Sequence, residues 1–256
     1  MVYRYSKNDV NTLKSESLSI DGKEVIFFDF LTRDGFTLLE GSDTLNASIK
    51  NESPISRVKY VNNNSILTDN VQNQAFKKFM DFVDRMLLFY SLDSRGYEGF
   101  MNGSEGIAEG IVNSGRVQDF QEFLKENDID YKLYGCEVDG RKAIYCHFEN
   151  KDADFFKIAS TGTRSLALFY YWYIRMEKAS FVFIDEFDAF YHFELSESVQ
   201  RHLNQIAGVQ IFTTTHNTDL MRNDLLRPDS YFLLENNRIQ DISELTEKEL
   251  RQAHNL

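Results

Sequence analysis

The chain has 256 residues, of which 42% are hydrophobic and 14% aromatic, and its formal net charge is −12. This length and composition exclude a disordered chain and predict one large folded domain, or a domain with an additional lobe. The excess of acidic residues excludes a general nucleic-acid coat and a protein that binds anionic membranes. A local patch that contacts DNA is compatible with this charge but is not supported by it.

The sequence predicts a cytoplasmic protein that has no contact with a membrane. No run of 18 apolar residues occurs, and the first residues, MVYRYSKNDV, have the pattern of neither a leader nor an anchor. Cys136 and Cys146 flank a hairpin that turns at Asp139-Gly140. In that hairpin Cys136 faces Ala143 and Cys146 faces Leu133, so the two sulfurs lie too far apart to bridge. Two unpaired thiols are typical of the cytoplasm.

The first half of the chain begins with strands and continues with helices. Short apolar runs alternate with turns in the first sixty residues, and IDGKEVIFF predicts a hairpin about Asp21-Gly22. Apolar residues then follow helical spacing across 73–92, NQAFKKFMDFVDRMLLFYSL. Residues 94–116 carry six glycines and no lysine, which predicts a loop rather than a phosphate-binding turn. A short amphipathic helix over 116–128 and the hairpin over 131–148 complete this half.

The second half alternates helices with buried strands. The spacing predicts, in order, a helix over 163–179, a strand over 181–184, a helix over 193–207, a strand over 209–215 and a closing hairpin over 230–242. This order predicts an α/β fold with a mainly parallel sheet and flanking helices on both faces. Asp185–Glu186 and Thr213–His216 occupy the carboxyl ends of two of these strands, where such sheets bind ligands.

Two carboxylates directly follow the apolar strand FVFI and give the first candidate site. This is the form of a Walker B strand, in which Asp185 would bind Mg²⁺ and Glu186 would orient or deprotonate the water that attacks a γ-phosphate. Acids at a strand end can instead pair with an arginine or begin a helix. The pattern alone does not decide between the two interpretations.

Two further motifs stand in register with these acids. Ser160-Thr161-Gly162-Thr163 precedes the long helix, where small residues let backbone N–H groups, the Ser160 hydroxyl and the helix N-terminus approach a phosphate. An ordinary N-cap explains the same residues when they are taken alone. His216 follows a strand beside the acids and could donate to a γ-phosphate, although a single histidine is more often structural.

In combination, the three motifs resemble the C-terminal half of an ABC-type ATPase domain over roughly 130–256. The resemblance implies that Ser160, Gly162 and Thr163 bind nucleotide as the signature turn. It also implies that Asp185 is the metal ligand, that Glu186 is the base and that His216 is the switch histidine. ATP and Mg²⁺ are the cofactors that it implies.

Within that superfamily, DEFDAFYH resembles bacterial AAA-type, ABC-like ATPases that are related to the SMC and OLD proteins. Those proteins often belong to phage-defence systems of the abortive-infection, retron or toxin-linked kind, so an effector or toxin protein is an implied partner. The resemblance places His192 in the D-loop region, near the second ATPase unit of a dimer. A surface histidine is the alternative for that residue.

The phosphate-binding half of such a site is absent from the sequence, because no G-x-x-x-x-G-K-[ST] occurs in the chain. Residues 1–60 resemble the strand-rich N-terminal part of the ATPase lobe, 61–130 an α/β insertion lobe that is mainly helical, and 131–256 the ATPase core. Three explanations stay open: a Walker A supplied by another chain, a truncated or split gene, or a degenerate ATPase that serves as a scaffold. In each case we expect the chain alone to be inactive.

Two other classes of function were weighed. A two-metal nuclease would use Asp185, Glu186 and Asp188, but no suitable lysine lies nearby and the other two motifs stay unexplained. A binding module that senses nucleic acid or an effector is the stronger rival. A homo- or heterodimer with an ATPase unit that supplies Walker A is the partner predicted by the leading interpretation.

Overall fold

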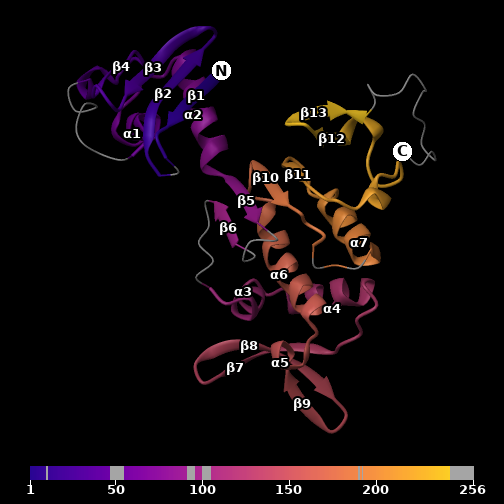
Figure 1. Ribbon diagram of the computed structural model, residues 1–256. Coiled ribbons are helices and arrows are strands. Elements are labelled where there is room, and N and C mark those ends of the chain that lie inside the picture. The colour runs from indigo at the N-terminus through magenta and orange to yellow at the C-terminus, as the bar shows by residue number, and fades with distance from the viewer. Residues whose placement is uncertain are drawn as a thin grey trace. The chain divides into compact units, whose positions relative to one another are not determined.

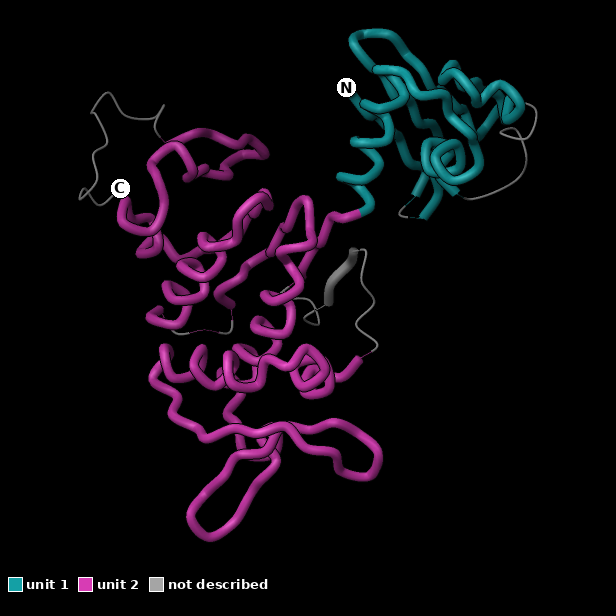
Figure 2. Tube along the Cα trace, turned by 180° about the vertical axis from the view of Figure 1, so that it is seen from behind, with its two compact units in different colours: residues 1–84 teal, residues 85–256 magenta. Residues whose placement is uncertain are grey.

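The computed structural model describes residues 1–9, 11–46, 55–90, 105–189, 191 and 193–242, and the backbone of 96–99. The chain forms two compact units, Met1–Asp84 and Arg85–Leu256 (Figure 1 and Figure 2). This division differs from the expected boundaries near 60 and 130. Residues 61–130 are shared between the units, because their first two dozen residues pack in unit 1 and the remainder contributes to the core of unit 2.

Unit 1 is an antiparallel sheet covered by two helices. Its strands are β1 (Val2–Lys7), β2 (Leu13–Ile20), β3 (Lys23–Asp29) and β4 (Asp34–Thr37), paired in chain order. Helices α1 (Arg57–Asn64) and α2 (Val71–Asp84) share a core with them. The expected turn joins β2 to β3, and both Asp21 and Gly22 have positive φ, as a two-residue hairpin requires.

A buried carboxylate joins the sheet of unit 1 to the start of α1. Glu16 is 1% exposed and accepts hydrogen bonds from the Tyr3 hydroxyl at 3.1 Å, the Ser56 hydroxyl at 2.8 Å and the Arg57 backbone N–H. Burial of Tyr3, next to Glu16, raises the pKa of the Tyr3 phenol. The Arg57 guanidinium lies over the Phe28 ring, 4.5 Å from its centroid. Charged groups are buried here because each has a polar or aromatic partner.

The centre of unit 2 is a four-stranded sheet in the order β11-β10-β5-β6. The strands are β5 (Met86–Tyr90), β6 (Gly96–Gly99), β10 (Phe181–Asp185) and β11 (Gln210–Thr213). β10 is parallel to both β5 and β11, and β6 is antiparallel to β5. The predicted mainly parallel sheet is therefore present.

One predicted helix is too long, and its last part is a central strand. The helical pattern over 73–92 ends with α2 at Asp84, and Met86–Tyr90 form β5. Five consecutive apolar or aromatic residues satisfy helical spacing and a buried strand equally well, so periodicity cannot separate the two. Parallel pairing with β10 decides for the strand.

Helices cover only one face of this sheet in the described part of the chain. On that face Leu87, Val182 and Ile184 are in the core of unit 2, together with residues of α6 (Thr161–Met176) and α7 (Phe193–Leu203). Phe89 contacts the Trp172 ring of α6. On this same face, the Thr213 hydroxyl donates to Gln200 of α7 at 3.3 Å. The expectation of helices on both faces is thus met on one.

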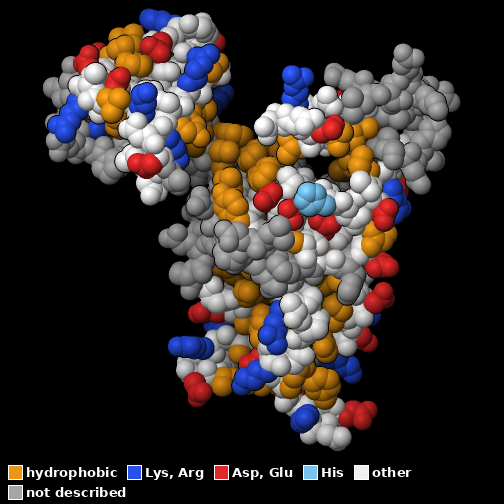
Figure 3. Space-filling view, viewed as in Figure 1, with side chains coloured by type: hydrophobic (Ala, Val, Ile, Leu, Met, Phe, Trp, Pro, Cys, Tyr) orange, Lys and Arg blue, Asp and Glu red, His pale blue; other side chains and the backbone are white. Residues whose placement is uncertain are grey.

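The opposite face of the sheet is apolar and partly exposed. Strand alternation places five apolar residues on it, Met86, Leu88, Phe181, Phe183 and Phe212, and none of them packs into the core of unit 2. Figure 3 shows hydrophobic side chains gathered over β5, β10 and β11, bordered by acidic side chains and a histidine. A parallel sheet with one open apolar face is unusual, because such sheets are normally covered on both faces.

The remainder of unit 2 extends the core below the sheet in Figure 1. Helices α3 (Ile107–Asn113), α4 (Val117–Glu126) and α5 (Phe155–Ile158) pack against the antiparallel strands β7 (Leu133–Val138), β8 (Arg141–Phe148) and β9 (Lys151–Asp154). The glycine-rich stretch predicted as a loop thus contains α3 and β6. Gly110 lets α3 approach α6 closely, since a Cβ there would lie 2.2 Å from the Tyr171 ring.

The cysteine hairpin has the predicted register. Cys136 pairs with Ala143 and Cys146 with Leu133, and both thiols are free. Burial raises the pKa of Cys146 to about 11. The closing hairpin is formed by β12 (Phe232–Glu235) and β13 (Arg238–Asp241). Within the described ranges, no helix combines the length and apolar character needed to cross a membrane.

Glu16→Ala tests the buried cluster of unit 1. Removing the carboxylate leaves one buried and two half-buried donors without this acceptor, so we expect the free energy of unfolding to fall by about 3 kcal/mol. Native-state amide exchange of β2 and β3 measures this change. Glu24→Ala, at an exposed position on β3, is the matched control and should change that free energy by less than about 0.5 kcal/mol. Equal effects of the two substitutions would contradict the account.

Candidate functional site

The carboxyl end of β10 brings the predicted acids to the edge of the central sheet. Asp185 is the last residue of β10 and pairs with Tyr90 of β5. Glu186 follows with φ +46°, a left-handed conformation that is uncommon for a residue other than glycine. Because the strand ends here, both carboxylates lie where parallel sheets bind ligands.

The loop after β11 contacts both acids. The Thr214 hydroxyl lies 2.7 Å from Asp185 Oδ1 and 2.7 Å from the Glu186 backbone N–H. His216 Nε2 lies 3.3 Å from Glu186 Oε1, and the His216 side chain is 90% exposed. The structure therefore brings Asp185, Glu186 and His216 together, as their positions at neighbouring strand ends predict. Their roles in a reaction stay predictions.

The same two loops meet at a second point. The Thr215 hydroxyl donates to Asp188 Oδ2 at 2.8 Å and accepts from the Asn217 N–H at 2.9 Å. The Tyr191 hydroxyl donates to the Ser165 carbonyl in α6 at 3.3 Å, which joins the segment between β10 and α7 to α6. His192, the predicted D-loop histidine, lies outside the described residues.

The Ser160 turn begins α6 and lies away from the acids. The Ser160 hydroxyl caps the helix by accepting from the Thr163 N–H at 3.1 Å, and the two hydroxyls lie 2.8 Å apart. A Cβ at Gly162 would meet only the Ser160 hydroxyl, 3.9 Å away. Ser160 and Thr161 are exposed, whereas Thr163 is buried. In the described part of the chain no hydrogen bond or ion pair joins this turn to Asp185, Glu186 or His216.

Helix length explains this separation. The sixteen residues of α6 span about 24 Å, whereas the five of β10 span about 17 Å. Because α6 runs back to the start of β10, its N-terminus extends past the carboxyl end of the strand. Within one chain, the N-terminus of α6 thus lies beyond the level of the acids along the direction of β10.

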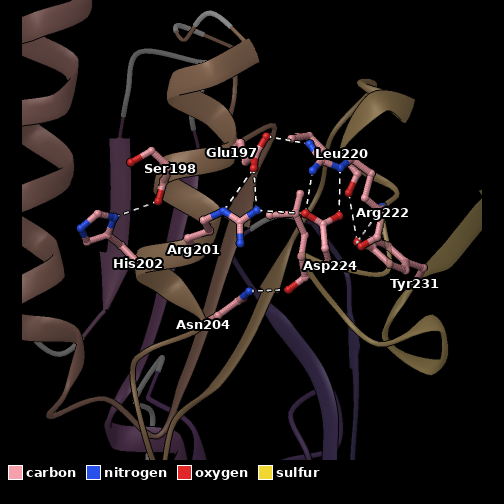
Figure 4. Close-up of polar contacts among 10 residues, drawn as sticks. Glu197, Ser198, Arg201, His202, Asn204, Leu220, Arg222, Asp224 and Tyr231 are labelled. Atoms are coloured by element: carbon pink, nitrogen blue, oxygen red, sulfur yellow. Dashed lines mark hydrogen bonds and ion pairs between the residues drawn. The ribbon is translucent and has the colours of Figure 1, made fainter. Parts of the chain in front are cut away.

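An ionic network fastens the segment that follows His216 to α7 (Figure 4). The Arg222 guanidinium binds Glu197 at 2.8 Å and Asp224 at 2.6 Å, and Arg201 binds the same two carboxylates at 2.6 and 3.0 Å. The Tyr231 hydroxyl accepts from the Arg222 backbone N–H at 3.0 Å. Arg222 and then Arg201 hold the pKa of Asp224 below its usual value. The network therefore holds the segment that follows His216 against α7.

The sequence places Thr214 and Thr215 at a strand end but predicts neither their contacts nor this network. The threonine run before His216 was visible, but nothing in the sequence shows which hydroxyl meets which acid. The network joins residues about 25 positions apart on elements whose contact depends on the fold.

The site has part of what a magnesium nucleotide needs. Carboxylate oxygens suit Mg²⁺, and Asp185 Oδ2 accepts no hydrogen bond from the described residues, which leaves it available. No group of three or more His, Cys, Asp or Glu residues in the described ranges could hold a metal ion by itself. A metal here would need ligands from its nucleotide or from water.

Comparison with known families decides the class. A family model described as "AAA domain, putative AbiEii toxin, Type IV TA system" matches residues 18–222 and so spans both units. The chain belongs to this AAA-domain family. It is thus a member of an ATPase family, which agrees with the resemblance carried by Asp185, Glu186 and His216. No curated protein matches the sequence.

Among solved structures, the SMC head domain from Thermotoga maritima is similar to this AAA-domain protein at 17% identity, with a TM-score of 0.35. The similarity covers 81% of this chain and 65% of that structure. The AAA-domain protein therefore spans about two thirds of the length of the solved relative.

Proposed function

We propose that this AAA-domain protein carries the hydrolytic half of an ABC-type ATPase site and that another polypeptide or segment supplies Walker A. In this proposal Asp185 binds Mg²⁺, Glu186 orients or deprotonates the attacking water, and His216 contacts the γ-phosphate. Ser160, Gly162 and Thr163 contact the nucleotide that a second ATPase unit holds. ATP and Mg²⁺ are the cofactors.

The observation that carries this proposal is the open apolar sheet face beside unneutralised acids. Asp185, Glu186 and Asp188 form no ion pair with lysine or arginine in the described part of the chain, and only His216 lies against Glu186. Asp185 and the exposed Phe212 share the uncovered face of the sheet. Apolar surface and carboxylates together favour a partner segment that brings both a hydrophobic surface and a positive charge.

The strand order leaves one place for that segment. A Walker A loop follows a strand, so its strand must lie parallel to β10 and β11 for the loop to meet Asp185 and His216. β10 is paired on both sides, and β5 has β6 as its second neighbour. In the described residues β11 alone, among the strands that end at the site, has an unpaired edge. A parallel strand added to β11 would bring a phosphate-binding lysine beside the acids.

The mechanism follows from these positions. When bound with ATP, Mg²⁺ would neutralise part of the negative charge of the phosphates. Asp185 would hold the metal through Oδ2 and Glu186 would accept the proton of the attacking water, and the Glu186–His216 contact at 3.3 Å orders the two side chains. The Ser160 turn forms no hydrogen bond or ion pair with the acids of its own chain in the described residues, which favours assigning it to a site across a dimer interface. Closing and opening of that dimer change what an attached effector can do.

We further propose that the effector acts in anti-phage defence and that the protein works in the cytoplasm as a homo- or heterodimer. The SMC/OLD-like motif DEFDAFYH supports this role. The description of the family, which names a toxin and a type IV TA system, agrees with it. A scaffold that no longer hydrolyses ATP is the alternative function. A scaffold would tolerate Asp185→Ala in a phage-protection assay, whereas the ATPase would lose protection.

The isolated chain should bind ATP weakly, because no phosphate-binding lysine loop occurs in its sequence. Titration with a fluorescent ATP analogue, with and without Mg²⁺, measures this binding. We expect no saturation at micromolar concentrations. Micromolar, Mg²⁺-dependent binding by the isolated chain would refute the requirement for a second source of Walker A.

Glu186→Gln tests the proposed base in the complex with the polypeptide that supplies Walker A. The amide cannot take the proton of water, so hydrolysis should fall by about 10²- to 10⁴-fold, and ATP should hold the closed dimer together in size-exclusion chromatography. Glu194→Gln, an exposed position on α7, is the matched control and should leave turnover unchanged. Normal turnover in the Glu186 variant would remove this residue from the role of base.

A further inference from the structure

Thr214 forms hydrogen bonds with four consecutive residues, 184–187, at the end of β10 and the start of the loop that follows it. Its backbone N–H donates to the Ile184 carbonyl at 3.0 Å, and its carbonyl accepts from the Phe187 N–H at 3.1 Å. Its hydroxyl lies 2.7 Å from both Asp185 Oδ1 and the Glu186 N–H. The backbone N–H, the carbonyl and the hydroxyl of Thr214 therefore all form hydrogen bonds with the segment that contains both acids.

The donors fix the direction of the hydroxyl proton. The Glu186 N–H can only donate, so the Thr214 hydroxyl accepts there and must give its single proton to Asp185 Oδ1. One carboxylate oxygen of Asp185 is thereby occupied. The other, Oδ2, is the oxygen that a metal can take.

The same hydroxyl supports the unusual backbone of Glu186. Glu186 has φ +46°, and such a conformation persists in a residue other than glycine only where its surroundings hold it. Thr214 binds the N–H of Glu186 and the N–H of the next residue, Phe187. In this conformation the Glu186 carboxylate meets His216 at 3.3 Å.

The neighbouring threonines make different contacts. The Thr213 hydroxyl donates to Gln200 of α7 at 3.3 Å, on the covered face of the sheet. The Thr215 hydroxyl binds Asp188. Of the three, only Thr214 touches Asp185 and Glu186.

We propose that Thr214 is a positioning residue for ATP hydrolysis. Its hydroxyl selects the oxygen of Asp185 that faces the metal, and it holds Glu186 in the backbone conformation that directs its carboxylate to the reacting water. This inference rests on the proposed function. The hydroxyl of Thr214, and not the volume of its side chain, would then set the geometry of both acids.

Three substitutions test the role of the hydroxyl. Thr214→Val keeps the shape of the side chain and removes the hydroxyl, and Thr214→Ser keeps the hydroxyl and removes a methyl group. Thr213→Val makes the same change one residue earlier and is the matched control. Each variant is studied alone by amide exchange and, with the Walker A polypeptide, by the kcat and KM of Mg²⁺-ATP hydrolysis.

In the isolated chain, Thr214→Val should speed exchange of the Glu186 amide by about ten-fold, because that amide loses its acceptor. The Val182 amide in β10 should keep its protection, which shows that the sheet is intact. Should Val182 lose protection, Thr214→Ala takes the place of Thr214→Val and is compared with Thr214→Ser in the same assays.

In the complex, Thr214→Val should lower kcat by about 10- to 100-fold, as expected for misplaced reacting groups, and change KM by less than about three-fold. Thr214→Ser should restore kcat to within about three-fold of the wild type, and Thr213→Val should match the wild type.

Unchanged kcat in Thr214→Val, a change in KM alone, or an equal loss in Thr213→Val would overturn the positioning role. An inactive wild-type complex would instead refute the proposed function itself, and the two failures are therefore distinct.

Discussion

The parallel pairing of β10 with β5 and β11 is the constraint on which the site depends. Parallel neighbours end at the same edge of a sheet, so Asp185 and Glu186 after β10 meet Thr214 and His216 after β11. Side chains about 30 positions apart in sequence therefore come within hydrogen-bonding distance. The pairing of the strands, rather than a side-chain contact, brings them together. The backbone hydrogen bonds between the strands place the two loops side by side, and the Thr214 hydroxyl then binds both Asp185 and Glu186.

The same sheet supports the proposal that a second segment completes the site. One face is filled by α6 and α7, whereas the other carries partly exposed apolar side chains that no described helix covers, and β11 has an unpaired edge within the described residues. Burial of that face would contribute favourable free energy in proportion to its apolar area. The carboxylates at its border need a cation, and the sequence provides no lysine loop to meet them. Packing and charge therefore favour the same proposed segment.

Much of the fold was predictable because local chemistry decides it. Asp-Gly turns fixed the hairpins at Asp21 and Asp139, and the Ser160 cap marked the start of α6. β5 was not predictable, because its five apolar residues fit a helix until β10 pairs with them. The acids and His216 were found from motif order. The hydroxyl contacts of Thr214 and the Arg201–Arg222 network were not, since they depend on which loops the sheet brings together.

The most direct measurement is a structure of this AAA-domain protein in complex with the polypeptide that supplies Walker A, bound to Mg²⁺ and a non-hydrolysable ATP analogue. We expect a new parallel strand along β11, a lysine-bearing loop at its end, the metal within reach of Asp185 Oδ2, and the Ser160 turn against the nucleotide of the opposite unit. A nucleotide bound away from Asp185 and Glu186, with β11 still unpaired, would contradict this expectation.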